Sequence, residues 1–262
     1  MKFTFGQNWR EFATHALSDK NVARARSDFD SLFSDCPLAG KTFLDVGFGQ
    51  GLALFLAEET GAAVFGIDRD LGTEAVLALT GRFFPGLPIP DHRIVSILDD
   101  EALRANLGSR VFHVVSAWGS LHHTGDMWKA MDNAAGYVAS GGTFVMAIYN
   151  RHWTSGIWKM VKALFSHSPE AIQRISIALF YPVIFAAVWS KTGRNPHDNP
   201  RGMDLYFDVA DWLGGYPYEY ASPNEVIAFM RGRGFDCLKV ILAFVPTGNN
   251  QYVFRRIPDG KS

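Results

Sequence analysis

The sequence has few cysteines and almost no net charge. Its two cysteines, Cys36 and Cys237, stand far apart and form neither a disulfide framework nor a zinc pattern, which favours a reducing compartment. A formal charge of −1 gives no overall attraction to nucleic acid, whose binders usually carry a basic surplus. The first residues contain no apolar export segment, so we expect a cytoplasmic protein.

Three glycines follow the first predicted strand at alternate positions. Residues 42–46 are an apolar run typical of a buried parallel strand, and a helix-forming segment begins at Leu52. Gly47, Gly49 and Gly51 therefore occupy a strand-to-helix turn, where glycine lets backbone N–H groups approach a ligand. The dinucleotide fingerprint needs its third glycine where Leu52 stands, so the spacing does not match that motif.

The motif Asp45-x-Gly47-x-Gly49-x-Gly51 resembles the first motif of class I methyltransferases that use S-adenosylmethionine. The resemblance implies that the loop passes under the methionine part of this cofactor. It also implies that Asp45 lies near the cofactor's ammonium group. An ordinary glycine-rich turn is the alternative.

A second apolar run, residues 63–67, ends at Asp68. An acid at the tip of this strand can accept hydrogen bonds from both ribose hydroxyls of a nucleotide, as in nucleotide-binding α/β folds generally. The alternative is that Asp68 or Asp70 caps the following helix. We expect Asp68 to bind the ribose and its neighbour Arg69 to contact the cofactor.

A third strand is predicted over residues 92–98, and acids again follow it. The resemblance implies that Asp99 bonds the adenine amino group while Leu98 packs on the ring. Helix capping by Asp99 or Asp100 is the alternative. The expected cofactor-binding residues are Asp45, Gly47, Gly49, Gly51, Asp68, Arg69, Leu98, Asp99, Ala117 and Trp118.

The fourth predicted strand, residues 111–117, leads into a loop with two adjacent histidines. Its segment Leu-His-His-Thr-Gly-Asp, residues 121–126, resembles the fourth motif of a bacterial methyltransferase branch near the ubiquinone-biosynthesis O-methylases. Histidine suits proton removal near neutral pH, so His123 is either a base for a substrate hydroxyl or a scaffold for the loop. His122 is the weaker candidate. A metal site is disfavoured because no carboxylate or cysteine stands at ligand spacing.

The closing part of the chain predicts the end of the sheet. A helix over residues 127–139 and a glycine stop precede the fifth strand, residues 143–149. After a long interval, Ser222 and Glu225 form a capping box that opens the last helix. Two strands then follow as a hairpin like the one that ends the methyltransferase sheet.

We therefore predict an α/β fold with a Rossmann-like seven-stranded sheet, an antiparallel last strand, and a mainly helical insertion between strands 5 and 6. The predicted parts are N-terminal helices over residues 1–40, a cofactor-binding core over 41–149, a substrate cap over 150–221, and a closing helix and hairpin over 222–262.

The insertion is rich in aromatic residues: residues 149–220 hold 14 of the chain's 36. Residues 175–189 form an uncharged run, shorter than the roughly twenty residues that span a bilayer. Three interpretations remain open: a buried helical cap, an interfacial membrane contact through residues 151–194, or a dimer surface. In the membrane interpretation, the residues expected at headgroup level are Lys159, Lys162, Arg174, Lys191 and Arg194.

The predicted function is transfer of a methyl group from S-adenosylmethionine to a small-molecule acceptor, with O-methylation favoured over N-methylation. The expected substrate-binding residues are Trp9, Tyr149, Asn150, Trp212 and Tyr216. The alternatives are a nicotinamide-dependent oxidoreductase and a non-catalytic cofactor-binding module. No nucleic-acid partner is expected, and the cytoplasmic protein is expected to contact the inner face of the membrane if the interfacial interpretation holds.

Overall fold

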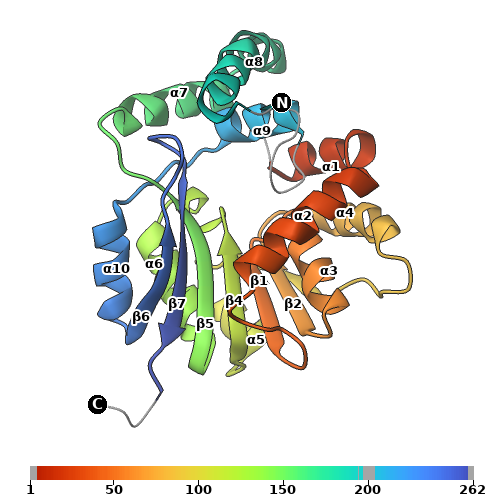
Figure 1. Cartoon of the computed structure of the whole chain (residues 1–262), viewed down its shortest axis with the longest axis vertical. Coiled ribbons are helices and arrows are strands. Elements are labelled where there is room, and N and C mark those ends of the chain that lie inside the picture. The colour runs from red at the N-terminus through yellow and green to blue at the C-terminus, as the bar shows by residue number, and fades with distance from the viewer. Residues whose placement is uncertain (1–4, 194, 197–203, 259–262) are drawn as a thin grey trace.

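The computed structural model describes residues 5–193, 195–196 and 204–258 (Figure 1). Arg194 and residues 201–203 of the predicted insertion lie outside these residues, as does the side chain of Lys191.

Seven strands form one sheet in the order β3-β2-β1-β4-β5-β7-β6. Each of the first five strands is parallel to its neighbours among them. Strand β7 lies between β5 and β6 and is antiparallel to both. The predicted seven-stranded sheet with an antiparallel last strand is therefore confirmed. The strands are β1 (Thr42–Val46), β2 (Ala63–Asp68), β3 (His92–Ile94), β4 (Phe112–Trp118), β5 (Val138–Tyr149), β6 (Phe235–Ile241) and β7 (Asn249–Arg256).

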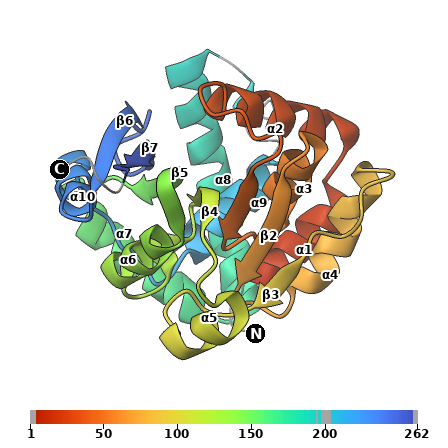
Figure 2. The ribbon, with the colours of Figure 1, turned by 90° about the horizontal axis from the view of Figure 1, so that it is seen from below.

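Helices cover both faces of this sheet (Figures 1 and 2). Side chains alternate along β1, so Phe43 packs with the helices of one face, whereas Leu44 and Val46 pack with those of the other. The first layer contains α2 (Asp19–Leu32) and α3 (Leu52–Glu59). The second contains α5 (Asp100–Leu107), α6 (Met127–Gly136) and α10 (Pro223–Arg231).

Three predicted boundaries were wrong by three residues or more. β3 ends at Ile94 instead of Leu98, α6 ends at Gly136 instead of Ala139, and β5 begins at Val138 instead of Thr143. The glycine pair predicted as a stop lies inside β5, where a Cβ on Gly142 would come within 2.8 Å of the Ala139 carbonyl oxygen. The register between β4 and β5 shifts at this level. These glycines therefore permit a β-bulge within β5 and do not end the strand.

The predicted capping box at the start of α10 is confirmed. The Ser222 side chain accepts from the backbone of Glu225, whose carboxylate accepts from the Ser222 backbone at 2.8 Å. Glu225 also accepts two hydrogen bonds from Arg151, at 3.0 and 2.8 Å. The segment that leaves β5 is therefore tied to the helix that follows the insertion.

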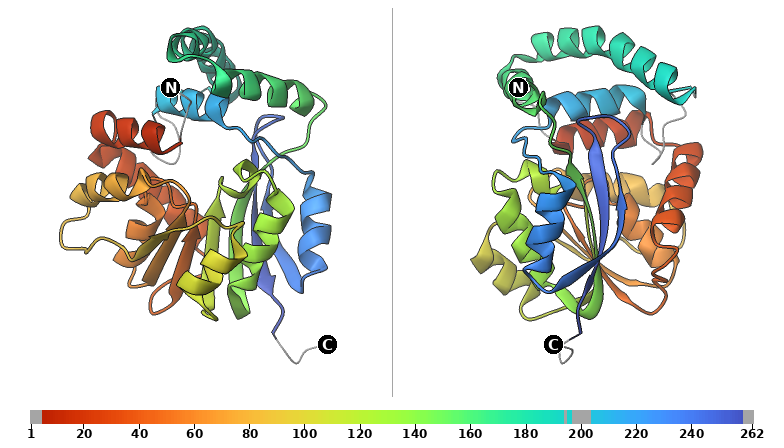
Figure 3. Two further views of the ribbon diagram at one scale, coloured as in Figure 1. Left: turned by 180° about the vertical axis from the view of Figure 1, so that it is seen from behind. Right: turned by 60° about the vertical axis from the view of Figure 1, so that its left-hand side comes forward.

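Three helices of the insertion form a cap above the carboxyl ends of the parallel strands (Figure 3). They are α7 (Ser155–His167), α8 (Glu170–Thr192) and α9 (Leu205–Gly214). A small apolar cluster that includes Phe165, Ile177 and Leu213 joins them. The N-terminal helix α1 (Phe5–His15) contacts α9 and also α4 (Thr73–Thr80), so it closes the cap from the other side.

Helix α8 is the outermost part of the cap and lies across α9 (Figure 3, right). Ile177 on its inner side is buried, but Ile175, Leu179, Val183 and Trp189 are each more than half exposed. Among the described residues, one segment, Glu170–Ser190, is long and apolar enough to cross a membrane by length and composition. The interpretation of residues 175–189 as a buried cap was therefore wrong for the outer face of α8, which α9 and α7 do not reach.

The predicted headgroup position of Lys162 was also wrong. Lys159 and Arg174 are exposed, as an interfacial position requires, but the Lys162 side chain has no exposed surface. The reason is helical geometry: Lys162 faces inward from α7, on the same side as the buried Phe165 and Ser166.

Candidate active site

The glycine loop lies where the strand order reverses, between β1 and β4, which is where doubly wound sheets bind ligands. Gly47 has a φ of 76°, and a Cβ on it would lie 2.4 Å from the Cβ of Ser120. Ser120 Oγ donates a hydrogen bond of 2.6 Å to the carbonyl oxygen of Val46. The loop after β4 is therefore fastened to the tip of β1, and only glycine fits between them.

Asp68, at the end of β2, holds the glycine loop through its carboxylate. Its two oxygens accept the backbone N–H groups of Gly49 and Asp70, both at 2.9 Å. The carboxylate of Asp70 in turn accepts the backbone N–H of Gly6 at 2.9 Å, so it caps α1 and not α4. The acids after β2 thus position both the loop and the helix above it.

Trp9 of α1 lies over this loop. Its indole Nε1 is 3.0 Å from the point where a side chain on Gly49 would begin. Trp9 was predicted as a substrate-binding residue, and the structure places it at the cofactor loop. It is therefore positioned to cover a ligand bound there.

Asp45 and Asp68 form a pair of buried carboxylates beside the loop. They are 4% and 9% exposed. Burial raises the pKa of Asp45 to about 7, a hydrogen bond from Ser116 opposes the shift, and the Asp68 charge adds to it. Burial also raises the pKa of Asp68, against the hydrogen bonds from Asp70 and Gly49. Two carboxylates in such a place favour a ligand that brings positive charge.

The predicted adenine-binding residues lie at the start of α5. Asp99 is the N-cap of that helix, and its side chain accepts the backbone N–H of Ala102 at 3.0 Å. Leu98 packs against the core on that side of the sheet. Asp100, the other capping candidate, accepts from Asn133 and pairs with Lys129. Helix capping by Asp99 is therefore present, and adenine binding by it stays a prediction.

The remaining predicted cofactor residues differ in exposure. Ala117 is fully buried within β4, Trp118 at its end is half-buried, and Arg69 is exposed. Their positions at the ends of β4 and β2 suit a ligand above the sheet.

Both histidines lie in a short helix, η2 (Leu121–His123), at the end of β4. Their ring centroids are 4.4 Å apart, and the Tyr149 ring at the end of β5 lies 4.1 Å from His122 and 5.5 Å from His123. The Tyr218 ring packs against Tyr149 with its centroid 4.8 Å away and its plane tilted by 59°. The structure thus brings Tyr149 together with the histidines, and the roles expected of these residues stay predictions.

His123 has a defined tautomer. Its Nδ1 lies 2.7 Å from the carbonyl oxygen of Pro217, which can only accept, so Nδ1 carries the proton and Nε2 keeps a lone pair. Burial and the nearby Lys162 charge lower the pKa of His123 to about 3. The imidazole is therefore a neutral hydrogen-bond acceptor at physiological pH.

His122 is more deeply enclosed. Its Nδ1 accepts the backbone N–H of Tyr149 at 3.3 Å, and its Nε2 has no hydrogen-bond partner among the described residues. Burial, followed by the charges of His123 and Lys162, holds its pKa well below the usual range. His122, the weaker candidate for the base, is thus fixed to β5 by its hydrogen bond with the backbone of Tyr149.

The segment after α9 holds the histidine loop in place, which the sequence did not predict. Glu219 donates its backbone N–H to the carbonyl of His122 at 3.0 Å, and its carboxylate accepts the N–H groups of Gly125 and Met127. The only sign of this role in the sequence was the acidic and aromatic composition near Glu219. No motif indicated which residues Glu219 would bond.

The other three predicted substrate residues contact neighbouring parts of the fold. Asn150 bonds the connection between β6 and β7, through Pro246 and Asn250. Tyr216 lies 5.9 Å from the His167 ring, and Trp212 packs against Trp158. Their contacts with a substrate stay predictions.

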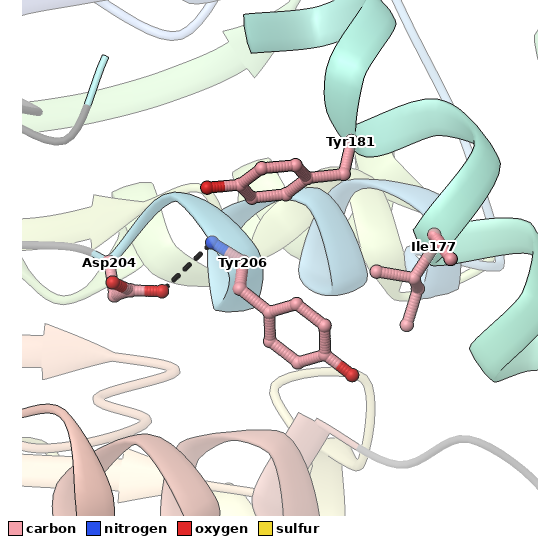
Figure 4. A pocket seen from close by; sticks show the side chains of 5 residues that line it. Ile177, Tyr181, Asp204 and Tyr206 are labelled. Carbon is pink, nitrogen blue, oxygen red and sulfur yellow. Dashed lines mark hydrogen bonds between the residues drawn. The ribbon is translucent and has the colours of Figure 1, made fainter. Parts of the chain in front are cut away.

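A groove of about 390 Å³ lies between α8 and the start of α9 (Figure 4). Asp204 caps α9 there by accepting the backbone N–H of Tyr206 at 2.8 Å. The groove lining contains none of the predicted site residues; it comprises Ile177, Ala178, Tyr181, Asp204 and Tyr206. It therefore belongs to the outer helices of the cap and not to the site above the strand ends.

The fold and the strand-end site define the class I methyltransferase architecture. The residues also fit S-adenosylmethionine: the glycine loop would let a ligand come close to its backbone, and the carboxylates of Asp45 and Asp68 would suit an ammonium group and ribose hydroxyls in charge and hydrogen bonding. A comparison with protein families matches residues 15–235 to the methyltransferase domain family. The chain belongs to this family, which disfavours the nicotinamide-dependent alternative.

Two curated relatives are similar over part of the chain, and both are named ubiquinone biosynthesis O-methyltransferase. The one from Paramagnetospirillum magneticum is 30% identical over 151 residues, which cover 58% of this chain and 52% of the relative. The one from Psychrobacter cryohalolentis is 32% identical over 146 residues, 55% of each chain. The chain thus matches about half the length of these relatives.

Among solved structures, the fold is similar to that of magnesium protoporphyrin IX methyltransferase from Synechocystis, determined with bound S-adenosylhomocysteine. The TM-score is 0.55 at 12% identity, and the match covers 90% of this chain and 83% of the other. At this identity the similarity supports the fold alone.

Proposed function

We propose that this protein transfers a methyl group from S-adenosylmethionine to a hydroxyl group of a small-molecule acceptor. The observation that carries the proposal is the buried carboxylate pair, Asp45 and Asp68, beside the glycine loop. The histidine pair lies at the end of the adjacent strand β4, so an acceptor held there is close to the cofactor. We take the cofactor-binding residues to be those predicted from the sequence.

In this proposal, the protein positions the methyl donor and the acceptor and keeps water away from them. S-adenosylmethionine, when bound, provides a methyl carbon that its sulfonium sulfur already activates. Catalysis can therefore rest largely on the orientation of the two partners. In the proposal, Trp9 covers the cofactor loop and Tyr149 forms the acceptor wall. His123 accepts a hydrogen bond from the acceptor hydroxyl at Nε2, which either orients that hydroxyl or removes its proton.

The names of the two curated relatives favour O-methylation over N-methylation for this chain. A hydroxyl also suits the lone pair of His123, because the donor O–H and the acceptor Nε2 are complementary. N-methylation is the second candidate.

Methyl-labelled S-adenosylmethionine incubated with the protein and a cell extract tests the proposal, with mass spectrometry of the labelled metabolites. A labelled ether is expected, together with release of S-adenosylhomocysteine. His123→Ala should lower turnover by about 10²–10⁴-fold while His122→Ala lowers it less. Calorimetry should show binding of S-adenosylmethionine and none of NAD. Cofactor binding without any labelled product would instead favour a non-catalytic module.

We also propose that the outer faces of α7 and α8 rest on an anionic membrane surface at the inner face of the membrane. Eight large apolar side chains of these helices, and Trp153 just before α7, are more than half exposed, and burying each one stabilises by roughly 1.5–3 kcal/mol. They are Trp153, Ile157, Met160, Leu164, Ile172, Ile175, Leu179, Val183 and Trp189.

Charge and aromatic placement favour lipid over a second copy of the chain. The exposed Lys159 and Arg174 can approach lipid phosphates, although Arg174 also pairs with Glu170. Trp153 and Trp189, near the two ends of the helix pair, suit the headgroup level.

Flotation with vesicles of anionic lipid tests this surface. Wild-type protein should float with the vesicles, and added salt should weaken the association. Leu179→Asp should lose it, whereas Leu71→Asp, an equally exposed position on the core, should keep it. A stable dimer that ignores vesicles would replace the membrane proposal with the dimer interpretation.

A further inference from the structure

Lys162 is a buried lysine at the junction of the cap and the histidine site. Its side chain has no exposed surface, which is rare for lysine. Among the described residues, its Nζ donates a hydrogen bond to the carbonyl oxygen of Trp212. The rings of Tyr149, Trp212 and Tyr218 surround this amine, with centroids 5.2, 4.6 and 4.9 Å from Nζ.

The lysine and the histidine pair share one enclosed cluster. The Tyr149 ring lies 5.2 Å from Lys162 Nζ, and its centroid is 4.1 and 5.5 Å from the His122 and His123 rings. His122 Nε2 is buried there without a partner among the described residues. Unsatisfied polar atoms of this kind are costly in a protein interior, and they are concentrated where a ligand or a reaction needs them.

A purely structural role explains the lysine poorly. A single hydrogen bond from α7 to the carbonyl at the end of α9 could come from a neutral side chain without the cost of burying a charge. The lysine instead places an amine among the rings of Tyr149, Trp212 and Tyr218. Its three donor hydrogens exceed what the Trp212 carbonyl uses.

The electrostatics make the amine able to exchange a proton near neutral pH. Burial lowers the pKa of Lys162 to about 7, and the Asp211 carboxylate opposes this shift. With its pKa near 3, His123 is the weaker proton acceptor at the same pH. The titratable and charged groups around Lys162 are His122 and His123 on η2, Tyr149 on β5, Asp211 on α9 and Tyr218 after it.

We propose that Lys162 is the proton acceptor of the methyl-transfer site, while His123 orients the acceptor hydroxyl. The inference rests on the proposed function. The acceptor O–H bond breaks, and its proton binds the lone pair of Nζ. The acceptor oxygen keeps the bonding electrons and forms the bond to the methyl carbon, whose bond to sulfur breaks with its electron pair left on sulfur. The proton leaves Lys162 to water after product release.

Turnover measured against pH with labelled cofactor and extract metabolites tests this role. Wild-type kcat should rise about tenfold per pH unit below pH 7 and then level off, because only the neutral amine accepts a proton. Lys162→Ala and Lys162→Arg should each lose about 10²-fold or more, since arginine stays protonated. Added ethylamine should restore part of the turnover of Lys162→Ala, which a purely structural role would not predict. Lys20→Ala, an exposed lysine on α2, is the control.

A second measurement does not depend on the acceptor. In protein labelled with ¹³C-lysine, the resonance missing from Lys162→Arg should titrate near pH 7. Titration near pH 10, or full turnover by both variants, would overturn the role of Lys162 while leaving methyl transfer intact. Absence of a labelled product from the wild-type protein would overturn the proposed function itself, and the lysine's role with it.

Discussion

Asp45→Asn should stabilise the ligand-free protein and weaken its affinity for the cofactor. The pKa of Asp45 rises from 3.8 to about 7 in the folded protein, mainly by burial. A shift of about three units at about 1.36 kcal/mol per unit makes the ionised carboxylate cost about 4 kcal/mol, an upper figure for this change. Because the side chain is only 4% exposed, solvent screens little of that cost.

The sign follows from proton binding. Between about pH 4 and pH 7 the folded protein holds the Asp45 proton more tightly than the unfolded chain does, so stability falls as pH rises through this window. Asparagine has no proton to lose and can still bond Ser116. The variant should therefore match the wild type near pH 4 and be more stable by up to about 4 kcal/mol near pH 8.

Urea unfolding at several pH values measures the stability change, and calorimetry measures the binding. A cationic ligand lowers the pKa of Asp45, so wild-type protein should release a proton when it binds S-adenosylmethionine near pH 6.5. Titrations in buffers of different ionisation enthalpy detect that proton, and the variant should release none. Identical pH dependence of stability in the two proteins, or unchanged cofactor affinity of Asp45→Asn, would refute the reasoning.

Three further changes probe the same loop, and Gly136→Ala in α6 serves as a control. Asp68→Ala should weaken cofactor binding by about 1–3 kcal/mol in calorimetry, because ribose hydroxyls lose a charged acceptor; a folded variant with unchanged affinity would remove Asp68 from the ribose. Gly51→Ala should lower the Tm, since its Cβ would lie 2.0 Å from Leu77 Cδ2 at a φ of 74°. Gly136→Ala, with no atom within 4 Å, should instead raise stability by about 0.4–1 kcal/mol, and equal effects of the two would contradict the steric argument. Ser120→Ala should cost about 1 kcal/mol in urea unfolding, and no loss would show that the bond to β1 is not stabilising.

Local patterns in the sequence were enough to predict most of the fold. Apolar runs, the glycine turn and the Ser222 capping box each depend on residues close together in the chain, so the order of elements was predictable. Boundaries that depend on partners were missed. The glycines near Gly142 resemble a stop until the neighbouring strand β4 shows that they lie in a bulge.

Residues of the candidate site could be predicted only where a short sequence motif contains them. Asp45 lies near the end of β1, Asp68 ends β2 and the histidines follow β4, and parallel strands bring these carboxyl ends together. Lys162 and Glu219 belong to the insertion. Their contacts depend on the packing of α7 against α9 and of the segment after α9 against the loop that follows η2. Sequence composition placed Lys162 at a surface because lysine is almost always exposed, and its inward direction became visible only in the packed helix.

The position of β7 between β5 and β6 has a consequence for how the chain is made. During synthesis β6 emerges before β7, yet it has no place in the sheet until β7 arrives and pairs with both neighbours. Until then β5 is an open edge whose backbone groups can pair with another strand, including one from a second nascent chain. Ribosomes that pause after β6 should therefore expose this edge for longer, and β5 is the strand that a chaperone acting during translation would need to shield.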